Sequence, residues 1–269
     1  MSKYPQTQEL PPLGALCLDY TDDIHRPPGD PLNPESFVFP LVHEKVNNAT
    51  VRNIVFSGAL DETLIDNFVD ACNKLEAKGA IGVITSCGFL AQIQDRLASK
   101  ISIPLASSSL LQIPSVLAFL PPNKKVAVLT FDERELGKSH FDGVGLSEAM
   151  QKRIVVHGAK DGCELKNIII EGGQYVIEKF EVEMIELAKK AVAQDSSIGA
   201  FVFECTQMPP TSKAVQKALG LPVYDVVTMI DWFYSGLVCR TFPEDSRKED
   251  GLRIRKRSAK ERVIEQSKN

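Results

Sequence analysis

Two cysteines stand at the ends of apolar runs, where their thiols could do acid–base chemistry. The run at 79–89 reads G-A-I-G-V-I-T-S-C-G-F and contains Cys87, and the run at 198–210 reads I-G-A-F-V-F-E-C-T-Q-M-P-P and contains Cys205. If both thiols face one small molecule, one thiolate can take a proton from a carbon beside a carbonyl while the opposite thiol returns one. That reaction inverts a stereocentre and needs no cofactor. A cysteine just before a helix is expected to have a lowered pKa, which suits the thiolate role.

Each run is typical of a buried strand in a parallel sheet, with a helix after it. The rest of the chain alternates between strand-like and helix-like segments. In the first half we expect strands at 13–19, 37–46, 79–86 and 101–107, and helices at 61–78, 88–99 and 110–120. In the second half we expect strands at 125–130, 153–157, 198–204 and 221–226, helices at 175–194 and about 227–240, and a helix ending at 219. Short apolar stretches lie at 51–57 and 165–171.

The two halves repeat each other. A Val-His pair at 42–43 recurs at 156–157, and Cys87 recurs as Cys205 at nearly the same offset. A single four-residue insertion between these points reconciles the two offsets. The repeat predicts an α/β fold of two similar three-layer lobes, with parallel sheets related by a pseudo-two-fold axis. The active site would lie in the cleft between them, at the strand ends that carry the cysteines.

The same repeat sets the expected domain boundaries. We assign 13–120 and about 227–240 to a first lobe carrying Cys87, and 121–226 to a second lobe carrying Cys205. Residues 241–269 are rich in lysine and arginine and are expected to be a peripheral basic tail. The segment 22–35 is a proline-rich loop, and a loop of that length inside a compact domain is more often functional than idle. Nothing in the sequence shows whether its Asp30 reaches the cleft.

Composition limits the partners. The chain has 269 residues and a formal net charge of −4, which argues against a nucleic-acid surface. No apolar run approaches the ~18 residues of a membrane span, and the amino terminus lacks the apolar core of a secretory signal, so a cytoplasmic location is expected. The six cysteines show no C-x-x-C spacing, and no metal or other cofactor is implied. The expected partner is a small molecule with a carboxylate or carbonyl, and a homo-oligomer is possible.

The strand-Cys-helix element in each half, together with Cys205-Thr206-x-x-Pro209, resembles the cofactor-independent aspartate/glutamate racemase superfamily over about residues 13–240. That superfamily also includes hydantoin racemases, maleate isomerases and arylmalonate decarboxylases. The resemblance implies that Cys87 and Cys205 are the paired acid and base. It implies that Asp19 supports the nearer cysteine and that Thr206 holds a substrate carboxylate.

Other positions depart from the pattern of the glutamate racemases. Gln207 stands where they carry a histidine, and Gly88-Phe89 replaces an expected Asn-Thr pair. These changes remove polar contacts and favour a hydantoin-like, aromatic or otherwise less polar substrate over glutamate. Three hydroxyl residues at strand ends either face the cleft or cap the strand ends. They are Ser86, Ser108 and Thr130.

Three functions remain open on these residues. The leading one is an isomerase, a racemase or epimerase acting on an amino acid, a hydantoin or a related small acid with both cysteines. The second is a decarboxylase or cis–trans isomerase on the same fold that uses mainly one cysteine. The third is a non-catalytic protein that binds an anion or senses redox state.

Overall fold

Two parallel four-stranded sheets form the frame of the protein. A computed structural model describes residues 4–19 and 24–242. The strand order is β2-β1-β3-β4 in one sheet and β6-β5-β7-β8 in the other, so the two orders are equivalent. The first sheet comprises β1 (Leu13–Leu18), β2 (Leu41–Val46), β3 (Val83–Thr85) and β4 (Leu105–Ala106). The second comprises β5 (Lys125–Thr130), β6 (Ile154–Gly158), β7 (Ile198–Phe203) and β8 (Val223–Tyr224).

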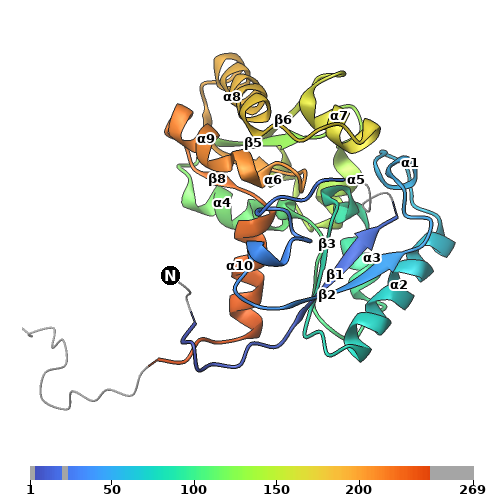
Figure 1. The fold of residues 1–269 in the computed structure, drawn as a ribbon. Coiled ribbons are helices and arrows are strands. Elements are labelled where there is room, and N and C mark those ends of the chain that lie inside the picture. Colours follow the sequence, from blue (N-terminus) through green and yellow to red (C-terminus); the bar gives the residue numbers. More distant parts are fainter. Residues whose placement is uncertain (1–3, 20–23, 243–269) are drawn as a thin grey trace, which may run out of the picture. The chain divides into compact units, whose positions relative to one another are not determined.

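Helices flank both sheets. Figure 1 shows α2 beside β1 and β2, and α8 and α9 on the side of the second sheet, in agreement with their contacts. The helices of the first half are α1 (Val51–Ile54), α2 (Glu62–Ala77), α3 (Gln94–Ala98) and α4 (Ile113–Phe119), with short 3-10 helices η2 (Pro34–Ser36), η3 (Gly88–Ile93) and η4 (Ser109–Gln112). Those of the second half are α5 (Lys138–Gly143), α6 (Glu148–Gln151), α7 (Glu164–Glu171), α8 (Ile177–Gln194), α9 (Pro209–Leu219) and α10 (Val226–Leu237).

The strand register confirms the internal repeat. Ala15 of β1 pairs with His43 of β2, and Leu129 of β5 pairs with His157 of β6, which keeps the offset found in the sequence. The fold predicted from that repeat, two similar α/β lobes with parallel sheets, is therefore correct. We call the part built on β1–β4 the first lobe and the part built on β5–β8 the second lobe.

Helix α2 shows why the sequence folds as it does. The side chain of Asp61 caps the helix by accepting a hydrogen bond from the Thr63 backbone N–H at 2.9 Å. Apolar side chains at helical spacing are buried against the first sheet, and the helix stops before Gly79, whose φ of +88° favours glycine. This is the helix expected at 61–78. Strand β7 is different, because all six of its residues are buried, as expected for a central parallel strand.

Several element boundaries differ from the prediction. Strand β2 begins at Leu41 rather than 37, because the ring of Phe39 instead stacks on Tyr234 of α10, with ring centroids 3.7 Å apart. The strand expected at 101–107 is only β4, since Pro104 has no N–H to donate. The apolar stretches at 51–57 and 165–171 contain α1 and α7.

The ends of the chain belong to a separate unit. Residues 9–239 form one unit, and residues 4–8 with 240–242 belong to a second, in which the Thr241 backbone N–H donates to Gln8 Oε1 at 2.8 Å. The basic tail predicted at 241–269 lies outside the described residues from 243 onward. None of the helices formed by the described residues is long and apolar enough to cross a membrane.

Candidate active site

The two cysteines singled out in the sequence line one pocket. Strand β3 leads into Cys87 and strand β7 leads into Cys205, so each lobe contributes one thiol. The empty space between the lining atoms is about 400 Å³, including the part that opens to solvent. The cavity proper has a volume of about 20 Å³, which is room for about one water molecule, so a small-molecule ligand needs the pocket walls to move apart. The other lining residues are Ile24, Arg26, Val55, Ser86, Gly88, Phe89, Phe131, Ile169, Glu204, Thr206 and Gln207.

Cys205 lies in an environment that opposes its ionisation. Burial, the neighbouring Glu204 and the opposite Cys87 raise the pKa of the Cys205 thiol well above its usual value, and a hydrogen bond from the Gln207 backbone N–H lowers it only in part. The lowered pKa expected from a position before a helix is therefore wrong for this cysteine. Helix α9 begins only at Pro209, and burial outweighs the helix end.

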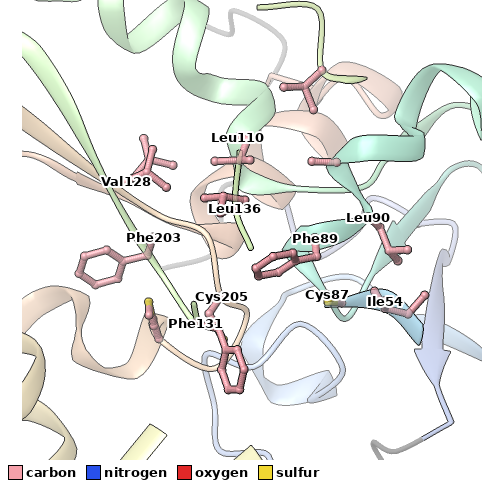
Figure 2. Packing of buried hydrophobic residues seen from close by; sticks show 14 of the residues in the cluster. Ile54, Cys87, Phe89, Leu90, Leu110, Val128, Phe131, Leu136, Phe203 and Cys205 are labelled. Carbon is pink, nitrogen blue, oxygen red and sulfur yellow. The ribbon is translucent and has the colours of Figure 1, made fainter. Parts of the chain in front are cut away.

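Cys87 is held by the end of its own strand. Its backbone N–H donates to Thr85 Oγ1 at 3.4 Å, and the Thr85 hydroxyl donates to the Ser107 carbonyl at 2.6 Å. Cys87 then caps η3, a 3-10 helix that passes into α3. The expected helix after this cysteine thus starts as a tighter turn. Figure 2 shows Cys87 and Cys205 with the rings of Phe89 and Phe131, two further pocket residues.

Glu204 is a site residue that the sequence pattern did not single out. Its side chain is 1% exposed and lines the pocket beside Cys205. The Thr130 hydroxyl donates to Glu204 Oε2 at 2.7 Å, and the Phe131 backbone N–H also donates to the carboxyl group. Burial nevertheless raises the pKa of Glu204 to about 7. A carboxyl that can gain or lose a proton near neutral pH therefore borders the thiols.

The absence of a side chain at Gly88 lets Glu204 approach the first lobe. A Cβ at position 88 would lie 2.3 Å from both the carbonyl oxygen and Oε1 of Glu204, which no real Cβ tolerates. The close approach of Glu204 therefore explains why glycine occupies this position. The carboxyl of the second lobe fills the space that a larger residue after Cys87 would occupy.

Thr206 and Ser109 tie the two lobes together beside the pocket. The Thr206 hydroxyl donates to the Ser86 carbonyl at 2.8 Å, and the Ser109 hydroxyl donates to the Phe203 carbonyl at 2.7 Å. The proton of the Thr206 hydroxyl is therefore directed at the opposite backbone. Its role in holding a substrate carboxylate stays a prediction.

The proline-rich loop brings a charged pair to the site. Arg26 lines the pocket, and its Nη1 donates to both carboxylate oxygens of Asp30 at 2.8 and 3.0 Å. Asp30 is 1% exposed and also accepts hydrogen bonds from the Leu32 backbone N–H and the side-chain amide of Gln207. Burial raises the pKa of Asp30 in spite of these partners. Only the length of the loop signalled its involvement.

The remaining predicted residues divide between the pocket and other places. Ser86 lines the pocket, where its Oγ accepts a hydrogen bond from the Leu18 backbone N–H at 3.3 Å. Ser108 is not a pocket residue, because its side chain caps η4. Thr130 reaches the site only through Glu204. Asp19 does not line the pocket either; an ion pair with Lys45 at 2.6 Å lowers its pKa.

No group of three or more potential ligand side chains that could hold a metal ion occurs among residues 4–19 and 24–242. The charged and titratable groups of the pocket are instead the two thiols, one guanidinium and the carboxyl of Glu204. Such a set is suited to moving protons on a small molecule. It also offers one positive and one negative end to that molecule.

Two parallel sheets with a pocket at their cysteine-bearing ends define the aspartate/glutamate racemase fold. Unliganded arylmalonate decarboxylase shares it with a TM-score of 0.53 at 14% identity, over 84% of this chain and 92% of that one. An aspartate racemase homologue from Pyrococcus horikoshii OT3 gives a TM-score of 0.52 at 15% identity, over 83% of this chain and 98% of that one. The fold expected from the resemblance seen in the sequence is thereby confirmed. No family model matches the chain.

Sequence relatives narrow the family. A dimethylsulfoniopropionate lyase of Durusdinium sp. clade D is 34% identical over 232 residues, covering 84% of this chain and 75% of that protein. Dimethylsulfoniopropionate lyase 7 of Emiliania huxleyi (strain CCMP1516) is 30% identical, covering 86% of this chain and 68% of that protein. The chain belongs to the family of these dimethylsulfoniopropionate lyases.

These relatives correct the leading prediction. The sequence pattern favoured an isomerase, a racemase or epimerase, whereas the relatives are lyases. The isomerase assignment is therefore wrong. The relatives agree better with the alternative, a decarboxylase-like reaction on the same fold.

Proposed function

We propose that this protein is a lyase that cleaves the carbon–sulfur bond of dimethylsulfoniopropionate. The observation that carries the proposal is the 34% identity to a lyase of that name, over 84% of this chain. A propionate with a sulfonium group on carbon 3 has a good leaving group two carbons from its carboxylate. The proton to remove is on carbon 2, beside the carboxylate carbon.

The chemistry is an elimination. A thiolate removes a proton from carbon 2 and becomes a thiol. The electron pair left on carbon 2 forms the carbon 2–carbon 3 double bond, and the carbon 3–sulfur bond breaks with its electrons going to sulfur. The products are acrylate and neutral dimethyl sulfide. The thiol then returns its proton to solvent, which restores the base.

One base is enough for this reaction. A racemase must remove a proton from one face and return one to the other, whereas an elimination ends once the leaving group has departed. We assign the base to Cys205. The Gln207 backbone N–H is bonded to this thiol and stabilises its thiolate. A thiolate of high pKa is also the stronger base for a weakly acidic proton beside a carboxylate.

Arg26 is suited to hold the substrate carboxylate. It is the basic residue among the described residues that line the pocket. Its ion-pair partner Asp30 bonds to Gln207, two residues after Cys205, which places the guanidinium on the Cys205 side of the pocket. A carboxylate bound there brings carbon 2 toward Cys205. Pairing the carboxylate with a guanidinium also makes the proton on carbon 2 more acidic.

The test is direct. The purified full chain is incubated with dimethylsulfoniopropionate, dimethyl sulfide is measured in the headspace, and acrylate is measured by proton NMR. Equal amounts of both products are expected, and the double variant Cys87→Ser/Cys205→Ser should release neither above background. A natively folded wild-type protein that forms no dimethyl sulfide would overturn the proposal.

A further inference from the structure

We infer that Glu204, Phe89 and Phe131 form a subsite for the positively charged head of the substrate. This inference rests on the proposed function and extends it to the recognition of an onium group, meaning a sulfonium or a quaternary ammonium. All three side chains line the pocket of the two thiols, and each is at most 7% exposed.

The first support is the composition of the pocket wall. Arg26 can receive a carboxylate, but an onium group carries no hydrogen to donate and cannot be held by hydrogen bonds. Such groups are recognised by aromatic faces and by nearby negative charge. Phe89 and Phe131 provide the rings, which Figure 2 shows near the cysteines, and Glu204 provides the charge.

The second support is that Phe131 already attracts a cation. Lys166 Nζ lies 5.5 Å from the centroid of the Phe131 ring. That ammonium is compensated by Asp132 and Asp161, which pair with it at 3.3 and 2.5 Å. The ring thus already lies beside one cation whose charge is compensated, and it also lines the pocket.

The third support is that Glu204 has no permanent counter-ion among the residues that the structure describes. Its hydrogen-bond partners are the Thr130 hydroxyl and the Phe131 backbone N–H, both of which are neutral. An onium group beside the carboxyl supplies the missing positive charge and favours the ionised form. Gly88 keeps this carboxyl at the pocket, because any side chain there would collide with Glu204 Oε1.

This arrangement makes binding of a cation sensitive to pH. Above a pH of about 7 Glu204 is ionised and attracts the onium, and below it the protonated carboxyl does not. Three other titratable or charged groups line the same pocket as this carboxyl, namely Cys205, Cys87 and Arg26. Asp30 acts on Cys205, and Lys166 with its partner Asp132 lies beside the ring of Phe131. A neutral ligand of the same shape should show no such dependence.

The experiment compares two ligands of one shape. The ligands are 3-(trimethylammonio)propionate, which is a cation at the head, and 4,4-dimethylpentanoate, which replaces nitrogen by carbon. Calorimetric titration of the full chain measures both affinities at pH 6 and pH 8. For the wild type we expect the ammonium ligand to bind about tenfold more tightly at pH 8, with the preference shrinking at pH 6.

Variants identify the residues. Glu204→Gln should bring the two affinities within about twofold at both pH values, and Phe131→Leu should reduce the preference by about threefold at pH 8. Asp225→Asn serves as a control, because Asp225 is another buried carboxyl of raised pKa that does not line the pocket. Its preference should equal that of the wild type. A wild type without preference, or a Glu204→Gln variant that keeps it, would overturn the inference.

The outcome is separable from that of the lyase assay. A protein that prefers the ammonium ligand but releases no dimethyl sulfide retains the onium subsite and contradicts the elimination. A protein that releases dimethyl sulfide but binds both ligands equally performs the elimination without this subsite.

Discussion

Ser86–Gly88 in the first lobe and Glu204–Thr206 in the second occupy equivalent places, each at the end of the third strand of its sheet. Their side chains behave differently. The first segment presents a thiol between a small hydroxyl and a glycine. The second presents a thiol between a carboxyl and a threonine, and both of these reach across to the first segment.

The difference shows how a symmetric frame can hold an asymmetric site. Proton removal from one face and return to the other would use two similar thiols. An elimination uses one base, and the surroundings of the two cysteines are free to diverge. Glu204 and Thr206 lie on the Cys205 side, whereas Ser86 and Gly88 receive them. The contrast between the segments therefore fits a lyase better than a racemase.

The largest expected effect separates the two thiols. Cys205→Ser should lower the rate of dimethyl sulfide release by about a thousandfold or more, because it removes the proposed base. Cys87→Ser should lower it by only about tenfold, through changes in packing and proton exchange. The measurement is kcat with each single variant. Losses of equal size would break the comparison and restore a mechanism that depends on both thiols.

The next effect concerns the contact between the segments. Gly88→Ala places a Cβ against Glu204, so we expect a loss of about 1–3 kcal/mol in the free energy of unfolding and a fall in activity. Gly236→Ala is the matched control, because a Cβ at this position in α10 meets nothing within 4 Å. That change should be neutral or slightly stabilising. Denaturant unfolding measures both variants. If Gly88→Ala were as stable as Gly236→Ala, the two lobes would be able to move apart at Gly88 without cost.

A third effect lies in the pH dependence of stability. Burial raises the pKa of Glu204 from 4.5 to about 7, so between these values the folded protein holds a proton that the unfolded chain has lost. The free energy of unfolding is therefore highest below about pH 4.5, where Glu204 is protonated in both states, and it falls as the pH rises toward 7. Glu204→Gln removes this fall in stability, because glutamine does not titrate. Relative to the wild type, the variant should gain about 2–3 kcal/mol in the free energy of unfolding between pH 5 and pH 8.

The equivalent residue in the first lobe provides the control for that measurement. Ser86→Ala alters a side chain that does not titrate, so its stability difference from the wild type should be the same at both pH values. A pH-independent difference for Glu204→Gln as well would mean that this carboxyl is ionised throughout the range.

The smallest effect tests the bond from Thr206 to the Ser86 carbonyl. Thr206→Val keeps the shape and removes the hydroxyl, which should cost about 1 kcal/mol in the free energy of unfolding. Thr206→Ser should retain the bond and most of that stability. Thermal unfolding followed by circular dichroism distinguishes the two. If both variants unfold at the wild-type temperature, the bond does not hold the segments together.

The frame and the two thiols are predictable from the sequence because both depend on local pattern. Apolar runs end where strands end, and a repeat places equivalent strand ends in equivalent positions. Cys87 and Cys205 can therefore be paired from the sequence alone. The direction of the Cys205 pKa shift cannot, because burial depends on neighbours from the other lobe.

Sequence patterns do not locate site residues that lie in irregular loops or that depend on tertiary contacts. Arg26 and Asp30 sit in a loop without periodicity, so nothing in the local pattern says where their side chains point. Glu204 does carry a signal, since a carboxyl that ends a fully buried strand must be accommodated by specific partners. The strand end at Thr130 allows either a place in the cleft or a cap of the strand end, and in the structure its hydroxyl donates to Glu204. Hydrogen-bond partners of this kind depend on tertiary contacts.

The bond between Thr206 and Ser86 joins residues 120 positions apart, which bears on how the protein is made in the cell. During synthesis the strand that precedes Cys87 leaves the ribosome long before its partner segment exists. The first lobe stays incomplete in that interval, because α10, whose Tyr234 stacks on Phe39, has not been made, and closing so long a loop has to await the second lobe. A nascent chain thus carries one thiol without the cover that the second lobe later gives it. Mild alkylation of stalled nascent chains should label Cys87 until residue 206 has emerged and folded, and much less afterwards.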